Sequence, residues 1–325
     1  MAGTINLSLL AEFHGELAQA LPPYEHDLYL HILQIAKAGK MMIQARTGHV
    51  TEINVEDEKL RKFILAGSKT IFKGDKHIAF RLCGPSALKV QEYYSDPASA
   101  RVDSSLFLWR LMIWRLWGWG RPELMEKLAT IINVNEGLIV LNQIDTDLGT
   151  PLTSMGVYGK IILPVAKREA ILKGISRVID ALVAQQSLLS FKALQDIFVQ
   201  ANIIYLPSTG LVLWLILCDL AEFGFCTQPT IEDLVTKLGS PPYVKKKKGK
   251  GGSGPVKGLF VVEQSSKGGH KIPYSTTQGV RNGLSQVFEA LKFHLDPMSQ
   301  ELQGRDFTVA DLEHVLCKIA RCAGN

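Results

Sequence analysis

Apolar side chains recur every three or four residues over much of this chain, which is the spacing of a helix with one buried face. This spacing predicts helices over 24–38, 167–188, 191–202, 276–291 and 307–323. The helix over 167–188 is the longest of these in a single range, and its buried stripe would consist of Ile171, Leu172, Ile175, Val178, Ile179 and Leu182. A threonine followed three residues later by an acid predicts where helices begin, as at Thr230–Asp233 and Thr308–Asp311. The pattern therefore predicts a mainly helical protein.

Two segments are apolar on nearly every face. The charges in 104–117 are Arg110 and Arg115, which lie among several tryptophans, and 211–223 is almost wholly apolar. A helix of this kind normally lies at the centre of a helical domain. For 104–117, a self-association interface and an aromatic platform for nucleic-acid bases are the alternatives, because Trp and Arg together favour both.

Aromatic and β-branched residues predict strands. The segment 258–264 (GLFVVEQ) would form one strand and 270–275 (HKIPYS) the next, joined by a turn at 265–269 (SSKGG). Pro273 lacks an amide hydrogen, so the second strand would lie at a sheet edge. Nearer the N-terminus, 69–82 has the pattern of another hairpin.

In the C-terminal half, two helices are separated by a break at 205–210 and followed by the predicted hairpin. The second helix ends in Leu217-x-x-Leu220-x-x-x-Gly224-Phe225, and the hairpin ends in Tyr274-x-Thr276-x-x-Gly279. This arrangement resembles the winged-helix superfamily. The resemblance implies a mainly α fold with small β-hairpins (α+β) and a C-terminal winged helix-turn-helix domain. It makes 211–223 the recognition helix, although that segment has no Arg, Lys, Asn or Gln to read base edges.

The loop at 145–157 is the best candidate for a domain boundary. It would separate a helical N-terminal domain, 1–150, from a winged-helix-like domain, 160–325. The N-terminal domain could include a second winged-helix unit at 24–82, where helix, strand, helix and hairpin follow one another. The C-terminal domain would contain a basic insertion at 240–257.

The basic insertion is the strongest sign of a charged partner. Its lysines, which lie among glycines, are Lys245, Lys246, Lys247, Lys248 and Lys250. Such a segment either binds nucleic-acid phosphates, with counterion release supplying affinity, or is a solvated linker. Lys267, His270 and Lys271 on the predicted wing, with Arg281 nearby, would extend a phosphate-binding surface. The net charge of the whole chain is only +5, so the charge excess is concentrated in this region.

Motifs for catalysis and cofactor binding are absent from the sequence. It lacks a P-loop, a dinucleotide fingerprint, H-E-x-x-H, a G-x-S-x-G elbow and kinase motifs. The five cysteines include no C-x-x-C pair, which argues against a zinc site and a disulfide framework. We therefore expect no enzyme activity, catalytic residue, metal or cofactor. Without a basic start to the N-terminus or a long apolar run, we expect a cytoplasmic or otherwise intracellular protein that is not secreted and has no membrane partner.

Two functions remain open at this stage. The first is a winged-helix DNA-binding replication, partition or regulatory factor that binds largely through phosphate contacts, with DNA expected rather than RNA. The second is a non-enzymatic scaffold or self-assembling structural protein, similar in role to a nucleocapsid, which would form a homo-oligomer. The basic insertion favours the first function, and the apolar recognition helix favours the second.

Overall fold

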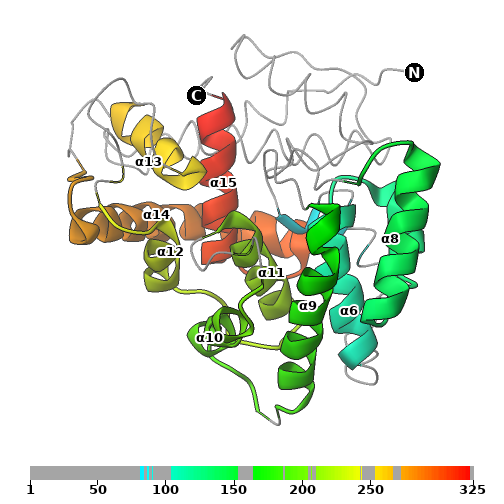
Figure 1. Cartoon of the computed structure of the whole chain (residues 1–325). Helices are drawn as coiled ribbons and strands as arrows, with labels where there is room; N and C mark the ends of the chain where they lie inside the picture. The colour runs from blue at the N-terminus through cyan, green and yellow to red at the C-terminus, as the bar shows by residue number, and fades with distance from the viewer. Residues whose placement is uncertain are drawn as a thin grey trace. The chain divides into compact units, whose positions relative to one another are not determined.

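The computed structural model describes residues 81–83, 86–87, 90, 104–152, 164–185, 187–203, 206, 210–241, 243, 253–265 and 272–322 (Figure 1). The chain divides into two compact units. Unit 2 is Pro85–Pro229, and unit 1 combines Met1–Gly84 with Thr230–Asn325. The predicted second winged-helix unit at 24–82 lies almost wholly outside the described residues.

Unit 2 consists of helices in its described part. Five longer α-helices (α6, α8, α9, α10 and α11) are joined by shorter helical segments, and a π-helical segment, η2, directly continues α6. The elements are α6 (Ser104–Ile113), η2 (Trp114–Gly118), η3 (Pro122–Leu124), α7 (Met125–Leu128), α8 (Val134–Leu148), η4 (Val165–Lys167), α9 (Arg168–Val183), α10 (Phe191–Ala201) and α11 (Leu211–Glu222). The predicted helices over 167–188, 191–202 and 211–223 are thereby confirmed within a few residues of their ends.

The core of unit 2 is formed by the two segments that are apolar on nearly every face. Phe107, Trp114 and Trp117 are almost completely buried, as is the whole of α11 from Val212 to Ala221. All six residues of the predicted stripe on α9 are buried as well. The tryptophan-rich helix is therefore core, because its aromatic side chains have left water for contacts with other apolar groups.

Unit 1 is also helical where the structure describes it. Its elements are η1 (Arg81–Cys83), α12 (Ile231–Leu238), α13 (Gly254–Ser265), α14 (Thr277–Gln303) and α15 (Val309–Cys322). Figure 1 shows α13 (yellow) beside α15 (red). Gly258 lets the two backbones approach closely, since a Cβ at this position would lie 2.1 Å from the carbonyl oxygen of Leu316. The predicted starts at Thr230 and Thr308 are confirmed, and Thr276 caps α14, for which the sequence left Thr276 and Thr277 as alternatives.

The predicted α+β fold with a C-terminal winged helix is wrong. The range 258–264 lies inside helix α13, and Ile272–Ser275, the described part of the predicted second strand, is irregular and turn. Among the described residues there is no strand, and the bridge between Leu189 and Cys226 is isolated. The winged-helix resemblance therefore has no sheet to support it.

Packing explains why 254–265 forms a helix despite its β-branched residues. Val256, Leu259 and Val262 are buried, and their spacing of three residues places them on one helical face. Pro255 lies in the first turn, where its missing amide hydrogen costs nothing. Burial of that face against the rest of unit 1 outweighs the modest β-propensity of valine, which depends strongly on context.

Candidate functional site

The residues that flank the two lysine-rich segments of unit 1 lie together. Tyr243 precedes the first segment, 244–252, and Ile272 follows the second, 266–271. The amide of Tyr243 donates to the carbonyl of Tyr274 at 3.1 Å. The carboxylate of Glu263, near the end of α13, accepts a hydrogen bond from the amide of Ile272. These two hydrogen bonds bring the residue before the first segment close to residues on both sides of the second segment.

The predicted site residues fall into two groups. The lysine-rich segments themselves lie outside the described residues, and with them Lys245, Lys246, Lys247, Lys248, Lys250, Lys267, His270 and Lys271. Arg281 is described and lies on the second turn of α14. The structure therefore gives the positions of the segment ends and of Arg281.

The turn before α14 is fixed tightly against the helix. The hydroxyl of Thr276 accepts from the amide of Gly279 at 3.1 Å, which caps the helix. A Cβ on Gly279 would lie 2.4 Å from the carbonyl oxygen of Pro273, so only glycine fits this contact. The end of the second basic segment is consequently held at a defined place beside the first turn of α14.

The side chain of Tyr274 is uncharged and packs against an apolar neighbour in this region. Its ring packs edge-on against Phe260 of α13, with ring centroids 5.9 Å apart. Burial raises the pKa of the Tyr274 phenol above its ordinary value, and the nearby charge of Glu263 raises it further. Tyr274 thus stays protonated and uncharged at neutral pH.

Arg281 is engaged by an acidic partner. Its Nε and Nη2 donate to the two carboxylate oxygens of Glu232 at 2.6 and 2.9 Å, and its Nη1 donates to Gln278 at 2.6 Å. Glu232 belongs to the first turn of α12. The hydrogen bond from Arg281 is the main reason why the pKa of Glu232 lies below its ordinary value. The sequence gave no sign of this pair, because its members are far apart in the chain.

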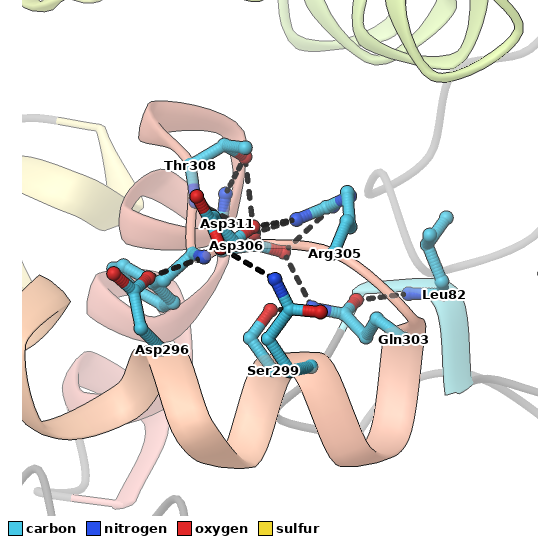
Figure 2. A network of polar contacts seen from close by, with 10 residues as sticks. Leu82, Asp296, Ser299, Gln303, Arg305, Asp306, Thr308 and Asp311 are labelled. Atoms are coloured by element: carbon cyan, nitrogen blue, oxygen red, sulfur yellow. Dashed lines mark hydrogen bonds and ion pairs between the residues drawn. The ribbon is translucent and has the colours of Figure 1, made fainter.

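A second polar cluster lies where α14 turns into α15 (Figure 2). The carboxylate of Asp311 accepts from Arg305 at 2.5 Å and from the amide of Thr308 at 2.9 Å. Asp296 accepts from the amide of Phe307 at 2.7 Å, and Gln303 accepts from the amide of Leu82 at 3.0 Å. These bonds satisfy backbone amides at a helix end, so the cluster is explained by the fold of unit 1.

Each unit also contains a buried ion pair. In unit 2, Arg115 donates to Asp219 at 2.6 Å through both Nε and Nη2, and its guanidinium lies 3.2 Å above the ring of Trp119. In unit 1, Lys237 donates to Glu313 at 2.6 Å. The first pair left a trace in the sequence, since Arg115 and Asp219 are opposite charges inside two largely apolar segments. Both pairs are too buried to meet a macromolecular ligand in this structure.

Other kinds of site find no support in the described part of the chain. No group of three or more His, Cys, Asp or Glu residues there could hold a metal ion. None of the helices in that part combines the length and the apolar character needed to cross a membrane. The described basic and polar groups around α14 are therefore the candidate site.

Comparison of the chain with protein-family models, with curated proteins and with solved structures found no match.

Proposed function

We propose that this protein binds nucleic acid through phosphate contacts made by the two lysine-rich segments of unit 1, and that it has no catalytic role. The supporting observation is that hydrogen bonds of Tyr243, Tyr274 and Glu263 bring the start of the first segment close to the residues that flank the second. Neither 244–252 nor 266–271 contains an acidic residue. Lysine-rich segments of this composition bind phosphates and release condensed counterions, which supplies affinity without sequence preference.

The apolar helix α11 supports a mode of binding without base readout. Its residues from Val212 to Ala221 are buried in unit 2, so they are not available to enter a groove. The expectation of DNA over RNA came with the winged-helix resemblance, and without that fold phosphate contacts serve either nucleic acid. The proposal is therefore a nucleic-acid-binding protein with affinity dominated by charge.

The test is fluorescence anisotropy with labelled duplex DNA, single-stranded DNA and single-stranded RNA across a salt series. In one variant Lys245–Lys248 are changed to Gln. The matched control changes four exposed lysines of unit 2 to Gln: Lys127, Lys167, Lys173 and Lys192. Loss of four phosphate contacts would reduce the slope of log affinity against log salt by up to about 3 in the first variant. Absence of binding at low salt, or an equal loss in both variants, would contradict the proposal.

A scaffold that assembles with itself is the second candidate. Two large apolar side chains support it, because Ile139 on α8 and Phe293 on α14 are 69% and 77% exposed. Exposed apolar groups of this size are typical of association surfaces when they are part of a wider patch. Light scattering on a sizing column, without nucleic acid, separates the candidates. A stable oligomer that dissociates in Ile139→Lys or Phe293→Lys and does not bind oligonucleotides would favour the scaffold.

A further inference from the structure

Arg281 holds the carboxylate of Glu232 in a geometry that also suits a phosphate. Nε and Nη2 each donate to a different carboxylate oxygen, at 2.6 and 2.9 Å. A planar guanidinium makes the same paired contact with two oxygens of a phosphate. We infer that Arg281 is a phosphate subsite of the nucleic-acid-binding surface, and that Glu232 occupies this subsite until nucleic acid displaces it. The inference rests on the proposed function.

Neighbouring polar groups complete the subsite. Gln278 accepts from Nη1 of Arg281 at 2.6 Å, which fixes the plane of the guanidinium. The hydroxyls of Tyr243 and Thr277 are hydrogen-bonded at 3.3 Å beside the start of α14. Hydroxyl groups commonly donate to phosphate oxygens. The subsite therefore offers a charged fork together with uncharged donors, which is the usual composition of a backbone-phosphate contact.

The subsite lies beside the described residues that flank the lysine-rich segments. Tyr243 immediately precedes the segment 244–252, and its amide is bonded to Tyr274 at the end of the second segment. A nucleic-acid strand bound by the lysines would thus pass close to the start of α14. Arg281 would then take a phosphate of the same strand, while the remaining phosphates bind lysines.

The Glu232–Arg281 pair is exposed enough to be exchanged. The two side chains are 59% and 34% exposed, respectively. An ion pair in such a position changes an equilibrium constant by at most about fivefold, because water competes with each partner. A phosphate held nearby by several lysines can therefore displace the carboxylate. Glu232 weakens binding in two ways, since it occupies the arginine and repels the incoming phosphate.

The experiment measures how tightly four forms of the whole chain bind oligonucleotides. The forms are wild type, Glu232→Gln, Arg281→Gln and the double variant. We expect Glu232→Gln to bind about threefold to fivefold more tightly than wild type. Its slope of log affinity against log salt should stay close to that of wild type, because Arg281 contacts a phosphate in both complexes, whereas Arg281→Gln should lower the slope by about 1. The double variant should lose the gain of affinity.

Glu169→Gln is a closely matched control. Glu169 is the second residue of α9, as Glu232 is of α12, and its carboxylate pairs with Lys173 at 2.7 Å. The two acids are 58% and 59% exposed, and both substitutions raise the net charge by one. Any effect of overall charge or of the helix dipole will therefore appear in both variants. The release of Arg281 will appear only in Glu232→Gln.

The possible results separate the inference from the proposed function. Tighter binding by Glu232→Gln alone, lost in the double variant, supports the phosphate subsite. If the wild type binds and Glu232→Gln binds no more tightly than Glu169→Gln, the subsite is wrong and the proposed function stands. Persistence of the gain in the double variant also overturns the subsite. If none of the forms binds oligonucleotides at low salt, both proposals fail.

Discussion

Helices meet in different ways in the two units. In unit 2, α6, η2 and α11 contribute large side chains to the core, and Phe107 packs against both Phe223 and Phe225. In unit 1, α13 and α15 pack so closely that the backbone of Leu316 occupies the space that a side chain at Gly258 would need. The first kind of contact is formed by residues that are recognisably apolar. The second depends on an absent side chain, which has no hydrophobic signature in the sequence.

Buried charge differs between the units as well. The Arg115–Asp219 pair lies in the apolar core of unit 2, where the two side chains are only 2% and 5% exposed. In unit 1 the buried pair is Lys237–Glu313, and a second acid–base pair, Glu232–Arg281, remains open to water. The Arg115–Asp219 and Lys237–Glu313 pairs are kept together because each charge would be costly to leave unpaired away from water. The Glu232–Arg281 pair is exposed to water and can change partners.

The largest effect should come from breaking the buried pair of unit 2. In Asp219→Ala, Arg115 would remain in the core without its carboxylate, and this loss should lower the free energy of unfolding by about 3–5 kcal/mol. The measurement is chemical denaturation followed by circular dichroism. Asp196→Ala is the control, because Asp196 forms an exposed pair with Lys192 and should cost less than about 1 kcal/mol. Equal losses of unfolding free energy in the two variants would show that water reaches the Arg115–Asp219 pair in solution.

The sequence predicted unit 2 better than unit 1 for the reasons seen in this comparison. The stripe from Ile171 to Leu182 and the apolar helices follow a 3.6-residue period that burial alone enforces. In unit 1, the segment 258–264 was interpreted as a strand because of its aromatic and β-branched residues. Only the position of α15, far along the chain, makes the same residues a helix.

The candidate site was predictable only in its composition. The lysine-rich segments and Arg281 could be recognised as basic, since charge is a property of the sequence itself. The hydrogen bond from Tyr243 to Tyr274 and the pair Glu232–Arg281 could not, because they join residues on separate elements. Tertiary contacts of this kind leave no periodic pattern to detect.

A smaller loss is expected from Gly258→Ala, which tests the close contact in unit 1. The added methyl group would overlap the backbone of Leu316, and overpacking of this kind costs about 1–3 kcal/mol. Gly283→Ala is the matched control in α14. There the three atoms nearest to the new Cβ all belong to the side chain of Ile272, and the closest is its terminal Cδ1, which can move. Denaturation of both variants should show a clear loss for Gly258→Ala and little change for Gly283→Ala; the reverse order would contradict the packing of α13 on α15.

Helix caps should have a still smaller effect, and the cap in unit 1 should contribute more than the cap in unit 2. Thr230 and Asp233 bond each other's backbone amides in a full capping box, so Thr230→Ala should cost about 1 kcal/mol. Ser190 in unit 2 caps α10 with a single bond to the amide of Ala193. Ser190→Ala should therefore cost less than Thr230→Ala. Thermal denaturation of the two variants tests the order, and an equal loss would mean that the reciprocal bond of Asp233 adds nothing.

The smallest effect concerns pH and the exposed pair of unit 1. The hydrogen bond from Arg281 lowers the pKa of Glu232 below its ordinary 4.5, against the opposing effect of burial. A carboxyl group whose pKa is lowered by folding adds stability above its unfolded pKa and loses it as pH falls through the folded pKa. Below about pH 4.5, wild type should therefore lose slightly more stability than Glu232→Gln, by less than about 1 kcal/mol for so exposed a pair. Arg281→Gln should remove most of this difference, because the arginine is the main cause of the lowered pKa. Identical acid denaturation curves for wild type and Glu232→Gln would mean that the pair is open in solution, and that Arg281 is already available to a phosphate.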